Sequence, residues 1–302
     1  MQRVLFLASF ACALLGASSA LSAPPSVPPP PAPLPAPPPP APAPPVPPQG
    51  TTLPAAARGI VTIELTSGSV HVVGWARSEV DVKNTAGSGT GTQFTVHGDR
   101  AAVHATSATL EIRVPAGSAV EVRGMSADVS VQDVTGALRF DVVSGAVAVK
   151  GAPASIAARS ASGKVSIEAS TPQTTVRTIS GDIHVRGVRG AAALESVTGT
   201  CTLSGTSFTR VEIRNTSSDV TFEGQLAAQG SFEARSHSGD VKLVLPASTS
   251  GNFELRSFSG SIESQIGSPR TGRGSLDFKA GTGAAIVRVQ TFSGGIAIDV
   301  RK

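Results

Sequence analysis

The sequence predicts an all-β chain: a single-domain β-solenoid of short strands with coils of 18 to 21 residues, preceded by a signal peptide and a Pro-rich linker. Three observations support this fold class. A small-residue unit repeats at a nearly fixed period, short runs alternate apolar and polar residues, and no window after Arg58 has helical periodicity. A β-sandwich with evenly spaced turns is the alternative that this pattern leaves open.

The first residues have the three parts of a secretory signal peptide. Arg3 gives a positive start, residues 4–15 form an apolar run, and "SSA" ending at Ala20 provides small residues for cleavage. We expect a signal peptide over residues 1–20, with cleavage as late as 23 as the alternative. The chain would then be exported, to the periplasm, the cell surface or the extracellular space. A lipoprotein anchored through Cys12 is less favoured, because "SFAC" lacks the Leu that usually stands three residues before the lipidated cysteine.

Residues 21–57 are predicted to be a disordered Pro/Ala-rich spacer. Residues 23–48 read "APPSVPPPPAPLPAPPPPAPAPPVPP". Proline lacks the N–H that helices and sheets require and fixes φ, so this stretch favours an extended polyproline II conformation. No later apolar run has the 18 or more residues of a membrane helix, so we expect no transmembrane helix once the signal is removed.

Residues 58–302 are predicted to be the solenoid domain, and a Ser-Gly unit marks each of its coils. We call the glycine of this unit, or the residue that replaces it, the corner residue. A hydroxyl residue precedes each corner, and apolar residues stand five before it and two and four after it, with few exceptions. This pattern indicates two short strands per coil that bury their apolar side against neighbouring coils. The corner residues are Gly68, Ala127, Gly145, Gly163, Gly181, Gly199, Ser218, Gly239, Gly260 and Gly294.

One cysteine falls in this pattern. Cys201 occupies the column two after the corner, which is otherwise filled by Val and Ile, so we expect a small buried apolar side chain. If Cys12 leaves with the signal peptide, no intramolecular disulfide can form. The last repeat, "IAIDVRK", is expected to end the stack.

The segments "SGSVHVVGWARSEVDV" (67–82) and "LEIRVPAGSAVEVRGMSADVSVQDVTGALRFDVVSGAVAV" (110–149), followed by serial Ser-Gly units, resemble the bacterial "putative adhesin" domain family. The resemblance covers about residues 58–302. It implies a β-solenoid-like exported or envelope protein with a role in adhesion, and it supplies no catalytic motif to transfer to this chain.

The residues indicate no enzyme, metal or cofactor chemistry. No histidine stands at metal-ligand spacing, and neither a nucleophile elbow nor a phosphate-binding loop is found. Four acids follow corners directly, Asp128, Asp182, Asp219 and Asp240. A role in the turn is favoured over calcium binding, since the dense Gly-Asp nonapeptide of calcium solenoids is missing. A net charge of +4 is too small for a dedicated nucleic-acid binder.

The column four before the corner is rich in arginine, and five of its members are the candidate binding residues: Arg159, Arg177, Arg214, Arg235 and Arg256. Coils at about 4.8 Å spacing would align this column as one exposed ladder. The arginines of this column either form ion pairs with the acids Asp141 and Glu195 of the same column, or bind anionic groups of another molecule. The second role would apply where Arg214, Arg235 and Arg256 follow one another in the column without an acid between them.

The sequence therefore predicts a non-enzymatic, exported adhesin or scaffold module of the envelope, without cofactors. It would bind an anionic envelope polymer or a protein partner along a rigid β face, and self-association is possible. A glycan-active β-helical enzyme and a self-assembling structural protein of the envelope are the alternatives.

Overall fold

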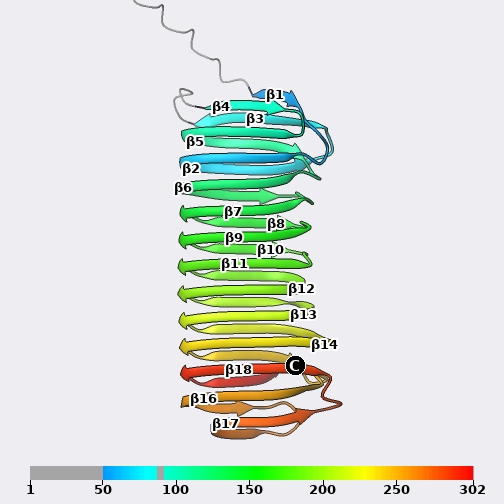
Figure 1. Ribbon diagram of the computed structural model, residues 1–302, viewed down its shortest axis with the longest axis vertical. Helices are drawn as coiled ribbons and strands as arrows, with labels where there is room; N and C mark the ends of the chain where they lie inside the picture. The colour runs from blue at the N-terminus through cyan, green and yellow to red at the C-terminus, as the bar shows by residue number, and fades with distance from the viewer. Residues whose placement is uncertain (1–49, 87–91, 302) are drawn as a thin grey trace, which may run out of the picture. The chain divides into compact units, whose positions relative to one another are not determined.

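The computed structural model describes residues 50–86 and 92–301 (Figure 1), which form strands and, within these ranges, no helix. The signal peptide and the part of the spacer up to residue 49 lie outside the described residues. The strands are β1 (Thr51–Pro54), β2 (Ile60–Trp75), β3 (Glu79–Ala86), β4 (Gln93–His97), β5 (Arg100–Pro115), β6 (Ala119–Gln132), β7 (Ala137–Ser144), β8 (Val147–Gly151), β9 (Ser155–Ser162), β10 (Val165–Ala169), β11 (Gln173–Ser180), β12 (Ile183–Thr198), β13 (Cys201–Ser217), β14 (Val220–Ser238), β15 (Val241–Pro246), β16 (Gly251–Ser264), β17 (Arg270–Ala280), β18 (Ala285–Ser293) and β19 (Ile296–Arg301).

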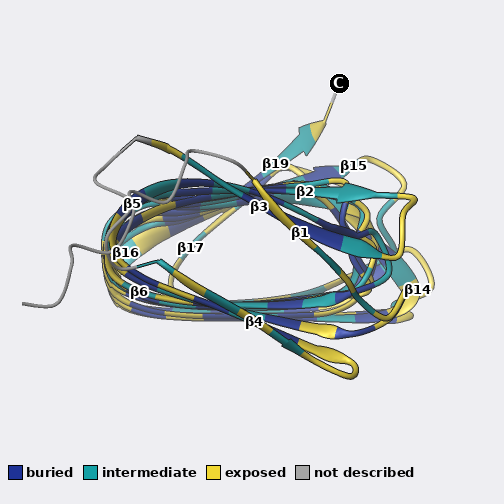
Figure 2. Cartoon of the chain, turned by 90° about the horizontal axis from the view of Figure 1, so that it is seen from above, coloured by how far each residue is buried: buried dark blue, intermediate teal, exposed yellow. Residues whose placement is uncertain are grey.

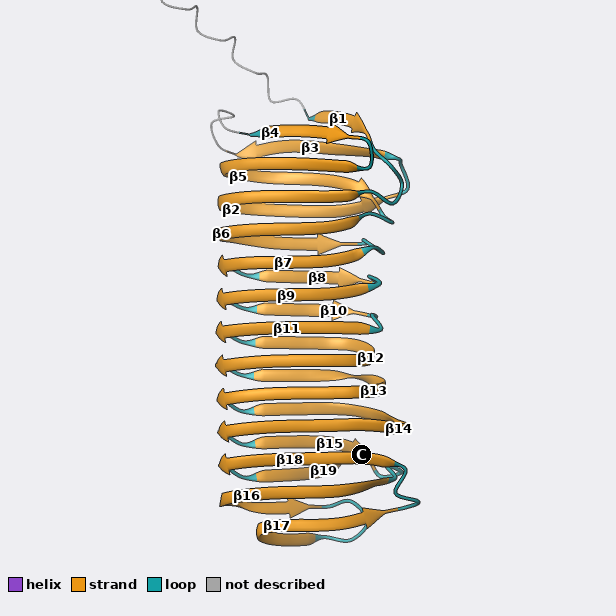
Figure 3. Cartoon of the chain, viewed as in Figure 1, coloured by secondary structure: helices purple, strands orange, loops and turns teal. Residues whose placement is uncertain are grey.

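Parallel pairing of equivalent residues confirms the repeat. Arg159 of β9 pairs with Arg177 of β11, and Val147 of β8 pairs with Val165 of β10, each 18 residues further along the chain. Long strands such as β12 contribute to both sides of the domain (Figure 3). Seen from above, the strands lie in two layers that face each other (Figure 2), and the apolar residues of the inward columns are buried. The described residues therefore form a solenoid-like stack of parallel strands.

The Ser-Gly corners are explained by a backbone that only glycine adopts readily. Gly163 and Gly181 have φ of 132° and 145°. A Cβ on Gly163 would stand 2.0 Å from the carbonyl oxygen of Gly145 in the preceding coil. Buried hydroxyls three residues before the corner add support, since Ser160 and Ser196 each donate to the carbonyl two residues on at 3.2 Å.

The N-terminal end of the stack departs from sequence order. Strand β2 lies between β5 and β6 and pairs in parallel with both. The antiparallel strands β3 and β4 both pair with β5, and β1 pairs with β3. Strand β1 lies inside the predicted spacer 21–57, because Thr51 and Leu53 pair with Val82 and Val80. This pairing moves the start of the folded domain from residue 58 to Thr51.

The C-terminal end corrects the expectation that the last repeat ends the stack. Strand β18 lies between β14 and β16, and β19 lies between β15 and the end of β16. The antiparallel strand β17 covers the other side of β16 (Figure 1). The last coil in sequence is thus the second to last in space, because β16 and β17 form a hairpin that closes the stack.

The inward columns form one continuous apolar core. The residues five before the corner, such as Phe140, Val176 and Leu194, are at most 2% exposed. Cys201 is buried as expected, and burial raises the pKa of its thiol to about 12. No helix long and apolar enough to cross a membrane occurs in the described part of the chain.

The acids that follow the corners bind the next coil in space. Each accepts a backbone N–H at 2.7 to 2.9 Å, and these acid–donor pairs are Asp128–Ala146, Asp182–Thr200, Asp219–Asp240 and Asp240–Gly295. The predicted role in the turn therefore has a concrete form, a hydrogen bond between coils. Within the described ranges, no group of three or more His, Cys, Asp and Glu side chains is placed to hold a metal ion.

Asp182→Asn should lower stability at neutral pH by about 0.5–1 kcal/mol. The Thr200 hydroxyl, and then the Thr200 amide, lower the pKa of Asp182 by donating to its carboxylate. A lowered folded-state pKa stabilises the fold above the unfolded value of about 3.9, and this contribution is lost as pH falls through the folded-state pKa. Urea unfolding should therefore show a difference between the two proteins near neutral pH that shrinks in acid. A difference independent of pH would contradict this account.

Candidate binding face

The outward residues of one sheet form three parallel columns, and we call the surface that they make the ladder face. Its strands are β5, β2, β6, β7, β9, β11, β12, β13, β14, β18 and β16 in spatial order. The charged ladder is the column four before the corner, and it is flanked by columns six and two before the corner. Alternation along a strand places all three on the same outer face.

The charged ladder does not follow the order expected from the sequence. From β2 to β16 it is Glu64, Arg123, Asp141, Arg159, Arg177, Glu195, Arg214, Arg235, Gln290 and Arg256. The structure brings together Arg159 with Arg177, and Arg214 with Arg235. Arg256 is separated from Arg235 by Gln290, because β18 is inserted between β14 and β16. The predicted run of Arg214, Arg235 and Arg256 is therefore interrupted.

Acids outside this column neutralise most of the candidate arginines. Arg177 contacts Glu195 at 3.1 Å, whereas the partners of Arg214, Arg235 and Arg256 come from the neighbouring column. These partners are Glu212, Glu233 and Asp277, and the first two distances are 2.5 and 2.6 Å. Hydrogen bonding between Arg256 and Asp277 raises the pKa of the guanidinium and lowers that of the carboxyl. Of the five candidates, only Arg159 forms no ion pair within the described residues.

The two columns four and six before the corner hold eight arginines and seven acids, and Asp277 of β17, which pairs with Glu254, adds an eighth acid beside them. The arginines are Arg123, Arg139, Arg159, Arg177, Arg214, Arg235, Arg256 and Arg288, and the acids are Glu64, Glu121, Asp141, Glu195, Glu212, Glu233, Glu254 and Asp277. The expected basic strip is thus a surface of mixed charge with a balanced sum.

The column two before the corner is an exposed apolar ladder that the sequence interpretation missed. Its central members are Met125, Val143, Ala161, Ile179 and Val197. Met125 and Ile179 are 61% and 60% exposed, although outward positions of a half-buried strand are normally polar. The same corner alignment contains this signal, because the apolar residues recur at a fixed offset. A contiguous exposed apolar patch of this kind marks an interaction surface.

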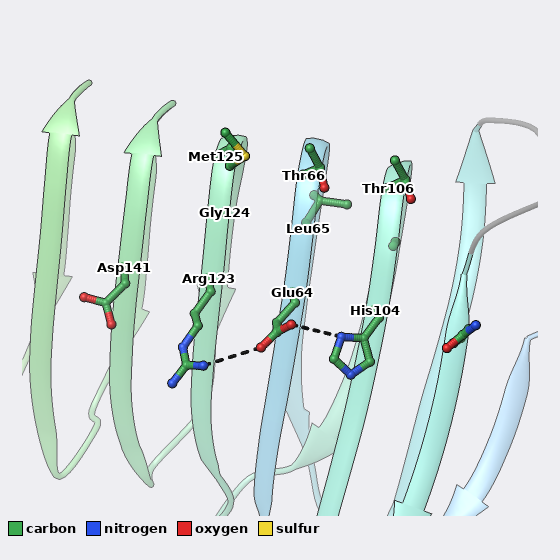
Figure 4. Close-up of a pocket in the computed structure, with 11 residues that line it drawn as sticks. Glu64, Leu65, Thr66, His104, Thr106, Arg123, Gly124, Met125 and Asp141 are labelled. Carbon is green, nitrogen blue, oxygen red and sulfur yellow. Dashed lines mark hydrogen bonds and ion pairs between the residues drawn. The ribbon is translucent and has the colours of Figure 1, made fainter.

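Two shallow grooves follow the boundary between the charged and apolar ladders. One runs over β6, β2 and β5, where Glu64 lies between Arg123 and His104 at 3.4 and 3.0 Å (Figure 4). The other runs from Asp141 to Val197 over β7, β9, β11 and β12. In the second groove the charged groups face Val143, Ala161, Ile179 and Val197, whereas in the first they face Met125, Thr66 and Thr106.

Stacked aromatic rings continue the apolar ladder toward β16. Phe292 stacks on His237 and on Phe258, with ring centroids 5.1 and 4.9 Å apart. Phe258 is 79% exposed, so the stack ends in an aromatic ring open to solvent. The ladder face is therefore apolar along one edge over most of its length.

Solved structures named as putative adhesion proteins align with this chain at low sequence identity. The chain covers 95% of a crystal structure called a putative adhesin from Bacteroides fragilis, at 10% identity over 83% of this chain and a TM-score of 0.39. It covers all of one called a putative cell adhesion protein from Clostridium sporogenes, at 9% identity over 84% of this chain and a TM-score of 0.19. No curated protein matches.

The family model described as Toastrack DUF4097 matches the chain twice, over residues 51–187 and 156–299. Together the two overlapping matches include nearly every described strand. The resemblance to an adhesin-like family that the sequence suggested is confirmed. The chain belongs to the Toastrack DUF4097 family.

Proposed function

We propose that this chain is a non-enzymatic, exported adhesion or scaffold module of the cell envelope, and that its ladder face binds a protein partner. The apolar ladder beside the charged ladder carries this proposal. A row of exposed Met, Val and Ile side chains would cost little to bury against another protein, and the charged neighbours would set the register of that contact.

The charge balance favours a protein over an anionic polymer as the partner. An anionic polymer needs cations that are free to bind it, yet Arg177, Arg214 and Arg235 each contact an acid. The apolar ladder would contribute nothing to a purely electrostatic contact. A protein surface can satisfy both ladders at once, since it carries apolar side chains and both signs of charge.

Export is supported by the signal sequence that residues 1–20 resemble, and an adhesion role by the family resemblance. The rigid sheet suits this role, because side chains held on a regular strand array lose little conformational freedom on binding. The mechanism is many shallow contacts along consecutive coils, each of them weak.

Co-sedimentation with isolated envelopes tests the proposal. Ile179→Glu places a charge in the middle of the apolar ladder and should reduce the bound fraction about tenfold or more, at low and at high salt. Ala148→Glu makes a comparable change on an outward position of the opposite sheet and should bind like the parent chain.

Two results would contradict the proposal. Binding that is abolished by salt but unaffected by Ile179→Glu would identify an anionic polymer as the partner. Release of soluble sugar from the envelopes by the chain would identify the glycan-active enzyme instead.

A further inference from the structure

The centre of the ladder face has an internal symmetry in its charges. Seven consecutive rungs of the charged ladder are, in order, Glu64, Arg123, Asp141, Arg159, Arg177, Glu195 and Arg214. The signs around Arg159 are opposite at equal distances. Asp141 mirrors Arg177, Arg123 mirrors Glu195, and Glu64 mirrors Arg214. A surface of this kind is complementary to itself when it is turned end over end.

The apolar ladder has the same centre. Over the same seven rungs it is Thr66, Met125, Val143, Ala161, Ile179, Val197 and Thr216. The smallest side chain, Ala161, lies in the middle. Val143 and Ile179 flank it, Met125 and Val197 follow, and threonine ends the row on both sides. Two independent columns therefore share one centre, on β9.

We propose that the protein partner of the ladder face is a second copy of this chain, paired face to face about a two-fold axis that runs along β9. This inference rests on the proposed function and names the occupant of the same face. Such an axis keeps each column opposite itself and reverses the order of the rungs. The interface is isologous, so every contact off the axis occurs twice.

This arrangement opposes unlike charges at six of the seven rungs. Each residue of one copy then faces its mirror residue of the second copy, and only Arg159 meets itself. Arg159 lies one rung from Asp141 of its own copy. It also lies one rung from the position where Asp141 of the second copy reaches Arg177. Arg159, which forms no ion pair among the described residues of the single chain, thus gains a second carboxylate on the side opposite its own Asp141.

Other registers oppose like charges. A shift by one rung in one direction sets Glu64 against Glu195, and Arg123 against Arg177. The opposite shift sets Asp141 against Glu195, and Arg123 against Arg214. A parallel arrangement sets every charge against itself. The charge pattern therefore selects one antiparallel register, which is how charged residues commonly specify pairing.

The size and shape of the face also suit a dimer. Seven rungs at about 4.8 Å spacing cover about 30 Å. With three columns, the footprint is on the order of 600–700 Å² per copy, near the ~800 Å² per partner of a standard interface. The strands stack in regular layers (Figure 1), so two such faces can lie against each other. Ala161 at the axis allows the closest approach where identical residues meet.

Charge reversal and mixing test the inference on the full chain. Asp141→Arg sets Arg against Arg177 of the second copy, and Arg177→Glu sets Glu against Asp141. Each variant alone should dimerise at least about tenfold more weakly than the parent in sedimentation equilibrium. An equimolar mixture should recover the affinity of the parent, because both mirrored contacts then join unlike charges. Any local loss of stability persists in the mixture, so recovery can come only from pairing across the interface.

Lys150→Glu is the matched control, since it reverses a charge on the opposite sheet and should leave dimerisation unchanged. Ala161→Cys gives a second measurement. A short bis-maleimide should link two copies at Cys introduced on the axis, whereas Ala148→Cys on the other sheet should remain unlinked. Cys201 is buried and will not compete, and Cys12 is changed to Ser in both variants so that the introduced cysteine is the one that reacts.

A monomeric parent chain at concentrations up to hundreds of micromolar, or a mixture no tighter than either variant, would overturn the inference. These outcomes are distinct from failure of the proposed function. A monomeric chain that still binds envelopes through Ile179 has a different protein on the same face. A monomeric chain that does not bind envelopes contradicts both.

Discussion

Gly181→Ala is expected to destabilise the solenoid by about 3–5 kcal/mol. Two effects add at this corner. The backbone has φ of 145°, which a residue with a side chain adopts only under strain. The new Cβ would also lie 2.1 Å from the carbonyl oxygen of Gly163, a backbone atom that the sheet holds in place. Relief of this contact requires separation of two neighbouring coils. Urea unfolding followed by circular dichroism measures the loss.

Gly98→Ala separates the two effects. Gly98 lies in the turn between β4 and β5 with φ of 62°, and nothing lies within 4 Å of a Cβ built there. Gly98→Ala should therefore lower the free energy of unfolding only by the cost of a left-handed backbone, about 1–2 kcal/mol. If Gly98→Ala and Gly181→Ala lose the same stability, the close approach of coils at the corner is not what requires glycine.

Phe222→Ala is expected to cost about 3–5 kcal/mol. Phe222 is 0% exposed and packs between Phe208 and Phe232, with ring centroids 5.3 and 4.8 Å away. The three rings fill the core where β13 and β14 pair. Alanine would leave a cavity that the regular backbone of the stacked strands cannot close by a small shift. Urea unfolding again gives the free-energy difference.

Phe258→Ala is the matched control for this truncation. This substitution removes the same atoms, but Phe258 is 79% exposed and, among the described residues, its ring stacks on Phe292 alone, so the loss of stability should be about 1 kcal/mol or less. Equal losses for Phe222 and Phe258 would contradict the assignment of the inward columns to the core.

The periodic features were predictable from the sequence because each coil repeats the same physical requirements. Glycine is needed where φ is positive and coils approach closely, as at Gly163. Apolar residues are needed where strands face the core, as at Val176 and Cys201. These requirements are local, so an alignment on the corners finds them.

The order of the last coils was not predictable in this way. Leu255 and Val289 fill the same inward column, and Arg256 and Gln290 fill the same outward column, so either coil fits either place. The antiparallel hairpin of β16 and β17 takes the end of the stack, and β18 and β19 return to pair with β14 and β15, which are distant in sequence. The pairing of Arg256 with Asp277 follows from that hairpin and was equally hidden.

The apolar ladder has a signal in the sequence itself. Met125, Val143, Ile179 and Val197 stand at one fixed offset from the corner. An outward apolar column violates the usual alternation, and such a violation is a sign of function when it repeats. The symmetry about Ala161, in contrast, requires that β2 and β6 are direct neighbours in space although β3, β4 and β5 separate them in the chain, and the structure supplies this pairing.

Hydroxyl-radical footprinting of the dilute chain, free and bound to isolated envelopes, tests the role of the ladder face most directly. Our account predicts that binding protects Met125 and Ile179 from oxidation, while His184 on the opposite sheet reacts equally in both states. Protection of His184, with Met125 and Ile179 as reactive as in the free chain, would show that the chain binds through its other sheet and would contradict the account.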